Sequence, residues 1–504
     1  VTGLFTTCFE EVVPVKNDLK SRLISPAVLR EIEHTLSEPT FLGTPIGPTL
    51  NDGLLMGLYN HRVQFNVKQR YMAYLRMCYH FCRVHWPREE VALPPVRPFL
   101  VTCLSQNIRI QELILPVVES IGKDRCIVAC LGPRFSSTIP GIIDIDWKQT
   151  VPRSAEIWRK EYRKCLPRWN EKIKCLCQEK SLPKGTYEFL TINMIISTQR
   201  VAGCIALLSH WKPSVIVTEY DRNDHWSCLV LAAKRLGIPT VTLIHGVTNE
   251  NALGYTPILA DRVLCWGHLQ KDALIGEGEN SEKIVVTGCP RLNRTLPLST
   301  AQALHKIGMD STKNTIMLAT SHIDFEILKK TVSVFCAASE KAGNWNAFIR
   351  LHPSERIVDY KNLKRQYPSI RFYDNSAFSL DDALAAADIV VVQNSGVGGD
   401  ALVKGKLVVV LSVDGAPLGH GAELVQKAGC PLASSSDDLF YEIQQLLSDK
   451  TRNQNVRSTA ETYVKDFCAA YGKVSAERIA ETIENIVAQT TFRRDNDSPQ
   501  KNLL

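Results

Sequence analysis

The segment 387–402 constrains the fold of this chain more than any other, because in it a buried strand runs straight into a turn and a helix. Residues 389–392 are four β-branched residues in a row, which is typical of a parallel strand covered on both faces. A turn with Ser395 and Gly396 follows, and Asp400 stands in the apolar segment after it. The first N–H groups of a helix are unpaired and its dipole is positive there, so such a strand end favours anions.

This strand end therefore predicts a phosphate site. The hydroxyl of Ser395 adds a hydrogen-bond donor, and Gly396 lets the backbone approach a ligand closely. The carboxylate of Asp400 is placed where it can reach a ribose hydroxyl. The alternative is a tight turn that binds no ligand, so the prediction needs support from other strand ends.

Composition makes the chain an ordinary globular protein. It has 504 residues, 45% of them hydrophobic and 22% charged, which allows two or three domains and disfavours disorder or a coiled coil. No apolar run approaches the roughly 20 residues that span a bilayer, and residues 1–15 lack the features of a signal peptide. We therefore expect a soluble, cytoplasmic protein. Since residue 1 is Val, we also expect either missing upstream residues or an unusual start codon.

The cysteines do not indicate a disulfide framework or a metal site. The 16 cysteines are scattered along the chain, so reduced thiols are favoured. Cys78, Cys82 and His85 share one face of an expected helix and could hold a metal. No second ligand pair follows at the spacing of a zinc site, so core packing is the favoured interpretation and neither metal nor cofactor is expected.

Positive charge is concentrated in one region, although the net charge is only +7. A charge run is usually a solvated helix face. The functional alternative is docking to an anionic membrane or an acidic glycan, and nucleic acid is disfavoured because no nucleic-acid-binding motif accompanies the charge. The residues are Arg159, Lys160, Arg163, Lys164, Arg168, Lys172, Lys174, Lys180 and Lys184.

The hydrophobic pattern predicts an α/β protein of two doubly wound domains with a cleft between their strand ends. A helical N-terminal extension (1–95) precedes the first domain (96–295), which carries a basic helical insertion at 148–208. The second domain spans 310–450, a C-terminal helical segment (451–489) packs back, and a disordered tail (490–504) ends the chain. Expected strands are 99–104, 126–130, 214–218, 240–244, 262–266 and 284–287, then 315–319, 346–351, 370–373, 389–393 and 407–411.

His352 and Pro353 end a strand of the second domain. The imidazole is expected at the same sheet edge as Ser395, where it can donate a hydrogen bond to a phosphate and stabilise the charge of a leaving nucleotide. Pro353 blocks further strand pairing. The alternative is a capped strand end without a ligand.

Glu219 and Asp221 follow the strand 214–218 of the first domain. Either carboxylate could act as the general base that deprotonates an acceptor hydroxyl. The alternative is a cluster that caps the next helix through Asn223 or Asp224.

Further strand exits supply weaker candidates for donor binding. His245 and Gly246 end one strand of the first domain, and Gly288 and Arg291 follow its last strand, where the guanidinium can neutralise donor phosphate from the hinge. Glu423 lies in a loop of the second domain and could contact the base or the ribose. Each can also be an ordinary strand-to-loop exit.

Taken together, these segments resemble the GT-B glycosyltransferases of bacterial capsule polysaccharide synthesis, which include the β-Kdo transferases. They resemble more distantly the CDP-glycerol glycerophosphotransferases and the UDP-GlcNAc 2-epimerases. The resemblance covers roughly residues 214–450. It rests on His245-Gly246, on 260–267, on 286–291, on His352-Pro353 and on 394–402 with Gly405-Lys406.

The resemblance implies two Rossmann-like domains and assigns the donor phosphate to His352, Ser395 and Gly396, with Asp400 near the ribose. The chain departs from the family pattern in three places. Leu407 stands where a proline usually follows, Gly396 replaces a second Ser or Thr, and an aspartate replaces the common glutamate at 400.

The expected activity is therefore metal-independent transfer of a sugar from a CMP- or UDP-linked donor to a hydroxyl of a capsular glycan or glycolipid. Peripheral contact with the inner face of the membrane is expected as well. The alternatives are a CDP-glycerol-type polyol-phosphate transferase, a 2-epimerase, and a non-catalytic protein that binds sugar nucleotides.

Overall fold

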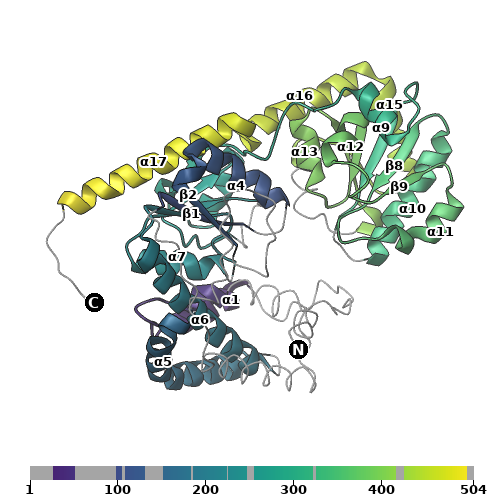
Figure 1. Cartoon of the computed structure of the whole chain (residues 1–504). Coiled ribbons are helices and arrows are strands. Elements are labelled where there is room, and N and C mark those ends of the chain that lie inside the picture. The colour runs from purple at the N-terminus through teal and green to yellow at the C-terminus, as the bar shows by residue number, and fades with distance from the viewer. Residues whose placement is uncertain are drawn as a thin grey trace.

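Two six-stranded parallel sheets organise the part of the chain that the computed structural model describes, which is residues 26–50, 98–104, 108–130, 151–182, 185–223, 225–246, 255–321, 325–415 and 425–496. Each sheet lies in its own domain, and the two domains are joined by helices near the C-terminus (Figure 1). The expected fold of two doubly wound Rossmann-like domains is confirmed.

The sheet of the N-terminal domain has the strand order β2-β1-β3-β4-β5-β6. Its strands are β1 (Leu100–Leu104), β2 (Cys126–Cys130), β3 (Val215–Thr218), β4 (Thr240–Leu243), β5 (Arg262–Cys265) and β6 (Ile284–Val286). Three helices that follow its strands are α4 (Ile108–Ile121), α7 (Trp226–Arg235) and α8 (His268–Gly276).

The sheet of the C-terminal domain has the order β12-β11-β10-β7-β8-β9. Its strands are β7 (Thr315–Ala319), β8 (Asn346–Arg350), β9 (Arg371–Tyr373), β10 (Ile389–Val392), β11 (Leu407–Leu411) and β12 (Leu432–Ala433). Its helices are α9 (Thr300–Ile307), α10 (Phe325–Ala342), α11 (Lys361–Gln366), α12 (Leu380–Ala386), α13 (Val397–Val403) and α15 (Ser436–Ser448). Every residue of β7, β10 and β11 is buried, as the apolar runs in the sequence predict.

Each sheet has one topological switch point, where consecutive strands stop being added on one side of the first strand and continue on its other side. In the N-terminal domain this point lies between β1 and β3, and in the C-terminal domain it lies between β7 and β10. Ligands of doubly wound sheets bind outside the carboxyl ends of the strands at such points. The strand order therefore directs attention to the residues that follow β3, β7 and β10.

The N-terminal extension and the insertion pack together on the N-terminal domain. Helix α1 (Pro26–Leu36) joins a core with α5 (Val151–Glu179) and α6 (Thr186–Trp211), built around the buried Trp158, Trp169 and Trp211. Arg222, which is fully buried, fixes α1 by donating to both carboxylate oxygens of Glu33 at 2.7 and 2.5 Å. The expected helix that carries Cys78, Cys82 and His85 lies outside the described residues.

Helix α5 separates its apolar and basic residues onto opposite faces. Trp158, Tyr162 and Trp169 are buried against α6 and α1. Two of its basic neighbours attach α1, since Lys180 pairs with Glu31 and Lys172 donates to a carbonyl of α1. The exposed basic side chains are Lys160, Arg163, Lys164, Arg168 and Lys174.

Helix α6 corrects the expectation that no segment of the chain is long and apolar enough to span a bilayer. Its length and mean hydropathy of 1.3 meet the requirements of a membrane span, and it is the only helix among the described residues that does so. In the structure 67% of that window is buried within the protein. The helix is therefore packed like a core helix of a folded domain.

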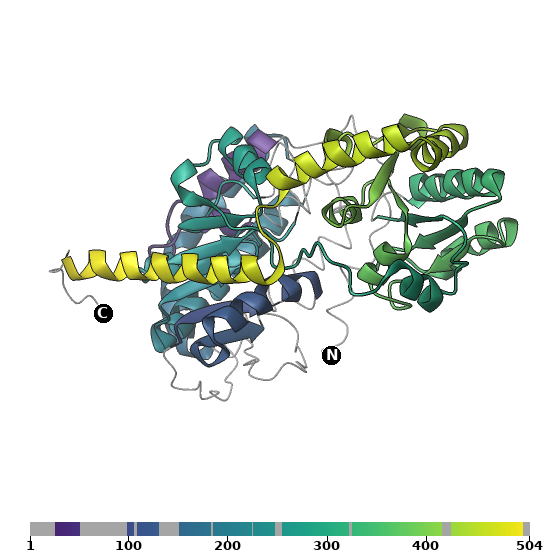
Figure 2. The ribbon, with the colours of Figure 1, turned by 90° about the horizontal axis from the view of Figure 1, so that it is seen from above.

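The C-terminal helices connect the two domains. Helix α16 (Lys450–Phe467) lies on the C-terminal domain, the chain then crosses over, and α17 (Gly472–Asn496) runs along α4 of the N-terminal domain (Figure 2). At the crossing Cys289 N–H donates to the carbonyl of Ala470 at 2.9 Å, and Phe467 packs edge-on against Trp266. This crossing fixes the segment after β6 to the C-terminal helices.

Gly288 belongs to this crossing. Its φ is +92°, and a Cβ there would lie 2.2 Å from the carbonyl oxygen of Ala470. Only glycine tolerates both the conformation and the close approach. The structure thus gives Gly288 a packing role, which does not depend on a bound donor.

Candidate functional site

Three neighbouring strands of the C-terminal sheet bring candidate residues to one edge. Because β10 pairs with β7 and β7 pairs with β8, Val392 and Arg350 lie on either side of Ala319. Thr320 and Ser321 therefore continue between the turn of Ser395 on one side and His352 on the other. The predicted phosphate site lies at the topological switch point of the sheet, with a threonine and a serine that the sequence reasoning missed.

The loop of His352 is held by hydrogen bonds to its backbone and its ring. The N–H of His352 donates to Thr320 Oγ1 and to Glu355 Oε2, both at 2.8 Å. Its Nδ1 accepts from the backbone N–H of Ser354 at 3.2 Å and lies 2.7 Å from Ser354 Oγ. A backbone N–H can only donate, so the ring hydrogen of the neutral imidazole is on Nε2. His352 thus carries its N–H at the atom that can donate to a phosphate.

Glu355 connects the ends of β7 and β8. Its carboxylate accepts hydrogen bonds from the His352 N–H, from the Thr320 hydroxyl and from the Tyr360 hydroxyl. Burial and the adjacent Glu355 raise the pKa of Tyr360, which therefore remains a donor. Sequence reasoning did not find Glu355, although a carboxylate three residues after the histidine is in reach of its N–H.

Ser395 is buried in the turn before α13, with 6% of its surface exposed. Its Oγ accepts from the N–H of Val397 at 3.4 Å, so the hydroxyl hydrogen can be directed elsewhere. On the adjacent strand end, Ser321 Oγ is buried and has no hydrogen-bond partner among the described residues. These hydroxyls and the N–H of His352 Nε2 make this edge rich in donors.

Asp400 and Arg291 bind each other across the domain boundary. Arg291 Nη1 lies 3.0 Å from Asp400 Oδ1, and both side chains are almost completely buried. Burial alone would lower the pKa of Arg291, but Asp400, together with Cys289 and Glu112, more than offsets this effect and raises the pKa. Asp400 Oδ2 has no hydrogen-bond partner among the described residues, so one carboxylate oxygen remains for a ligand.

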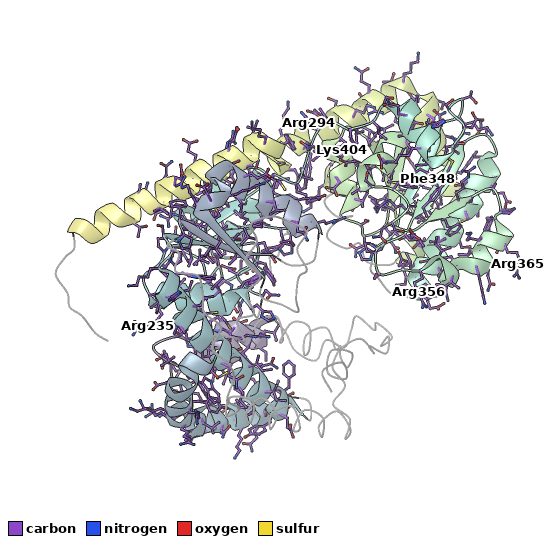
Figure 3. All side chains as sticks on the ribbon, viewed as in Figure 1. Arg235, Arg294, Phe348, Arg356, Arg365 and Lys404 are labelled. Carbon is purple, nitrogen blue, oxygen red and sulfur yellow. The ribbon has the colours of Figure 1, made fainter. Side chains whose placement is uncertain are left out.

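Lys404 reinforces this boundary. It pairs with Asp381 at 3.0 Å and donates to the carbonyl of Asn293, also at 3.0 Å. Figure 3 places Lys404 beside Arg294 at the junction of the two domains. The segment after β6 is therefore attached to α13 by Arg291 and by the backbone of Asn293.

Glu219 and His245 form a pair at the carboxyl edge of the N-terminal sheet. Glu219 is buried and accepts from Trp226 Nε1 at 2.8 Å. His245 Nδ1 lies 3.1 Å from the backbone oxygen of Glu219 and 3.4 Å from its Oε2. Both are acceptors, so Nδ1 carries the hydrogen and Nε2 of the neutral ring is the basic atom. Burial raises the pKa of Glu219, against the opposing effects of His245 and Trp226.

Aromatic rings surround the more exposed partner of this pair. The side chain of His245 is 34% exposed, whereas that of Glu219 is 9% exposed. The rings of Tyr220 and Tyr255 lie 5.3 and 5.6 Å from the imidazole, centroid to centroid. A ligand that approaches this sheet edge from solvent would therefore meet His245 first, with Glu219 behind it.

Asp221 lies deeper than the sequence reasoning assumed. Its Oδ2 accepts from the N–H groups of Leu259 and Ala260 at 2.8 and 2.7 Å, and the side chain is fully buried. Burial raises its pKa to about 6. The residue holds the loop before β5, which favours Glu219 and His245 over Asp221 as the reactive groups.

The remaining candidates differ in what surrounds them. The carbonyl of Gly246 accepts from the buried Gln270 at 2.9 Å, so this glycine fixes the exit of β4. Pro353 is exposed on the loop after His352. Glu423 lies outside the described residues.

Among the described residues no group of three or more His, Cys, Asp or Glu side chains could hold a metal ion.

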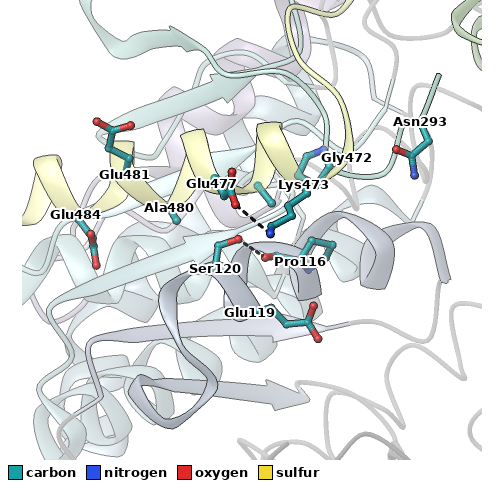
Figure 4. A pocket seen from close by; sticks show the side chains of 12 residues that line it. Pro116, Glu119, Ser120, Asn293, Gly472, Lys473, Glu477, Ala480, Glu481 and Glu484 are labelled. Atoms are coloured by element: carbon teal, nitrogen blue, oxygen red, sulfur yellow. Dashed lines mark hydrogen bonds and ion pairs between the residues drawn. The ribbon is translucent and has the colours of Figure 1, made fainter. Parts of the chain in front are cut away.

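A pocket of about 580 Å³ lies away from these strand ends, between α4 and α17 (Figure 4). Its lining includes the carboxylates of Glu119, Glu477, Glu481 and Glu484. An acidic lining repels phosphate groups. The carboxylates disfavour phosphate in this pocket, which borders the segment after β6 at Pro290 and Asn293.

Comparison with protein-family models and with curated proteins gave no match. Solved structures share the fold at low sequence identity. A UDP-GlcNAc 2-epimerase from Neisseria meningitidis bound to UDP-GlcNAc is 14% identical with a TM-score of 0.50, over 77% of this chain and 99% of the other. A putative UDP-N-acetylglucosamine 2-epimerase from Listeria monocytogenes is 12% identical with a TM-score of 0.50, over 81% and 100%. Anabaena HepE in complex with UDP and glucose is 15% identical with a TM-score of 0.46, over 77% and 99%. The two likenesses with a TM-score of 0.50 agree with the two parallel six-stranded sheets in giving the GT-B arrangement of two Rossmann-like domains.

Proposed function

We propose that the chain is a GT-B glycosyltransferase, which moves a sugar from a nucleotide donor to an acceptor hydroxyl. The observation that carries this proposal is the pair of histidines with opposite roles at the two sheet edges. His352 in the C-terminal domain presents a hydrogen on Nε2, and His245 in the N-terminal domain presents a basic Nε2. One ring is arranged to donate to a leaving group and the other to accept a proton.

The donor phosphate binds at the edge formed by His352, Ser321 and Ser395 in this proposal. The donors of this edge meet the negative charge that develops on the nucleotide as its bond to the sugar breaks. They are fixed before the reaction, because Glu355 and Thr320 hold the backbone of His352 in place. The proposed reaction needs no metal ion for this step.

The acceptor hydroxyl is activated from the N-terminal domain. Its proton passes to His245 Nε2 while its oxygen forms a bond to the anomeric carbon and the bond to the donor phosphate oxygen breaks. Glu219 keeps the hydrogen of His245 on Nδ1 and stabilises the positive charge that the ring acquires. The rings of Tyr220 and Tyr255 provide a surface on which a sugar of the acceptor can pack.

We further propose an acceptor that is a surface or capsular glycan on a lipid, reached at the inner face of the membrane. The exposed basic face of α5 supports this, because its five cationic side chains lie on the side of the helix opposite its buried aromatic residues. Such a face attracts anionic headgroups.

A turnover assay distinguishes the candidate activities. Sugars linked to CMP and UDP, and CDP-glycerol, are incubated with the chain and a glycan acceptor, and the released nucleotide and the products are measured. A glycosyltransferase releases nucleotide in proportion to the glycosylated acceptor. A polyol-phosphate transferase transfers glycerol phosphate from CDP-glycerol to the acceptor and releases CMP, and a 2-epimerase inverts C2 of UDP-GlcNAc without an acceptor. Glu219→Gln and His245→Ala should abolish transfer while leaving nucleotide binding intact. A non-catalytic protein would bind nucleotide and show none of these products.

A further inference from the structure

Two charged side chains of helix α1 reach the segments that flank the Glu219–His245 pair. Arg30 and Glu33 are three positions apart, so they project from the same face of the helix. The helix belongs to the N-terminal extension and lies outside residues 214–450, the part of the chain on which the resemblance to a known family rests. Its contacts therefore have to be interpreted from the structure itself.

Glu33 fixes the loop that follows β3. Arg222, three residues after Glu219, donates two hydrogen bonds to the Glu33 carboxylate. The side chains of Arg222 and Glu33 are 0% and 7% exposed. Removing a guanidinium from water is unfavourable unless an opposite charge compensates it. Loss of the Glu33 carboxylate would therefore force Arg222, and the loop that carries it, into a new position.

The four residues of this loop contact four different parts of the domain. Glu219 accepts from an indole of α7, and the ring of Tyr220 lies edge-on to the imidazole of His245. Asp221 holds two backbone N–H groups before β5, and Arg222 binds α1. A displacement at one end of so short a loop reaches its other end. The position of Glu219 relative to His245 therefore depends on the contact with α1.

Arg30 fixes a second segment beside His245. Its Nη2 donates to Thr256 Oγ1 at 3.3 Å and pairs with Glu277 at 2.9 Å. Thr256 directly follows Tyr255, whose ring lies 5.6 Å from the imidazole of His245, centroid to centroid. Helix α1 thus contacts both segments that supply the aromatic rings around this histidine.

Helix α1 is itself held in place at Glu33. Gly47, at the start of the 3-10 helix η2 (Gly47–Leu50), packs against its backbone. A Cβ at this glycine would lie 1.7 Å from the carbonyl oxygen of Glu33, so only glycine tolerates the approach. Helix η2 lies in turn against α6 and α7. Because α1 is supported from its other side, it can hold Arg222 in a defined position.

We propose that helix α1 is part of the acceptor site and positions its groups from outside the Rossmann-like domain. Glu33 aligns Glu219 with the general base through Arg222. Arg30 places the ring of Tyr255, on which an acceptor sugar packs, through the hydroxyl of the next residue. Both are positioning residues, since each acts through another side chain. This inference rests on the proposed function and gives the N-terminal extension a role in the transfer step.

Steady-state kinetics of the full chain test the two roles separately, with UDP- and CMP-linked sugars and the glycan acceptor of the turnover assay. Glu33→Gln should lower kcat by about 10- to 100-fold, because a small misplacement of a catalytic group has an effect of this size. Its KM for the acceptor should change little, and Glu33→Asp, which keeps the carboxylate, should recover part of kcat. Arg30→Ala should instead raise the KM for the acceptor by about three- to tenfold, the equivalent of one hydrogen bond. UDP and CMP should bind both variants with the Kd of the wild type.

A second measurement does not depend on turnover. The nitrogen chemical shifts of His245 should report the Nδ1–H tautomer in the wild type and a mixture of tautomers in Glu33→Gln, because Glu219 no longer accepts from the ring at a fixed position. The matched control is Glu31→Ala on the same helix, which removes a pair with Lys180 at a side chain that is 45% exposed. It should leave kcat, KM and the tautomer unchanged. If Glu33→Gln does not fold, Glu33→Asp and the half-exposed Arg30 carry the test.

The outcomes separate the role of α1 from the proposed function. If the wild type transfers sugar and neither Glu33→Gln nor Arg30→Ala differs from Glu31→Ala, the inference is overturned while the proposed function stands. If Glu33→Gln only reduces the amount of folded protein, with kcat, KM and the His245 tautomer unchanged, α1 has a structural role alone and the inference is again overturned. A wild type that transfers no sugar, with a His245 tautomer that changes in Glu33→Gln and not in Glu31→Ala, would contradict the proposed function and support positioning by α1.

Discussion

Arg291 and Asp400 form a buried ion pair that joins the two domains, with Nη1 of the arginine 3.0 Å from Oδ1 of the aspartate. The residues are 109 positions apart in the chain. A buried charge that loses its partner is destabilising by about 3–5 kcal/mol, because it is left unpaired in a medium of low polarity. We therefore expect this pair to matter for stability as well as for the donor site.

Asp400→Ala should lower the free energy of unfolding by about 3 kcal/mol in urea titrations. The double variant Arg291→Ala/Asp400→Ala should be less destabilised than the sum of the two single variants, since neither charge is then left alone. Lys341→Ala breaks an exposed pair with Asp437 and should change the free energy by less than about 1 kcal/mol. Strictly additive effects of Arg291→Ala and Asp400→Ala would show that the pair does not exist in solution.

Glu355 should position His352 without contacting the donor. Glu355→Ala removes the acceptor of the His352 N–H and of two hydroxyls, so we expect a fall in kcat/KM of about tenfold. The nitrogen chemical shifts of His352 should report the Nε2–H tautomer in the wild type and a mixture of tautomers in Glu355→Ala. Glu355→Gln keeps one acceptor oxygen and should recover part of the activity. If Glu355→Ala changes neither the tautomer of His352 nor kcat/KM, Glu355 does not position His352.

Much of the proposed phosphate-binding edge of the C-terminal sheet could be predicted from the sequence, because its signals are local. The apolar run of β10, the turn at Ser395 and the His-Pro at the end of β8 each appear within a few residues. Thr320 and Ser321 were missed because their importance depends on the order β10-β7-β8, which no local pattern contains. Glu355 was missed although its position three residues after His352 is a local signal.

The N-terminal domain was harder to predict because burial decides the roles of its acidic residues. Glu219 and Asp221 are two positions apart and have the same chemistry, yet one is bound to His245 and the other to two backbone N–H groups. Similarly, α6 has the composition of a membrane span and is largely covered by the protein. Such differences follow from tertiary packing and leave little trace in the sequence.

Asp221 should make stability depend on pH in a defined window. Its pKa is raised from 3.8 to about 6 in the folded state, so the folded protein holds the proton that the unfolded chain has lost between these values. The contribution is therefore complete below about pH 4 and is lost as the pH rises through about 6, a change of about 2–3 kcal/mol. Asp221→Asn keeps an acceptor for Leu259 and Ala260 and removes the titration.

The difference between the wild type and Asp221→Asn is the quantity to measure, because other carboxylates titrate in both. Urea unfolding at pH 4 and pH 7 should show that the wild type loses more stability than Asp221→Asn over this interval. Equal losses in the two proteins would mean that the pKa of Asp221 is not raised in the folded state.

The exposed basic face of α5 should bind anionic membranes. Replacing Arg163, Arg168 and Lys174 by Gln should weaken binding to vesicles that contain phosphatidylserine by about 100-fold, at about 1 kcal/mol for each cation. The matched control replaces the exposed Lys361, Lys364 and Arg365 of α11 and should leave binding unchanged. Equal losses in the two triple variants would indicate a general charge effect instead of a docking face.

The most direct test of the account is calorimetric titration of nucleotides into the wild type, His352→Ala and His305→Ala, where His305 is an exposed histidine on α9. The account predicts that the nucleotide of a proposed donor, UDP or CMP, binds the wild type and His305→Ala with the same Kd, and that His352→Ala weakens its binding by about tenfold or more. A wild type that binds no nucleotide, or a His352→Ala variant that binds as tightly as the wild type, would contradict a donor site at this sheet edge.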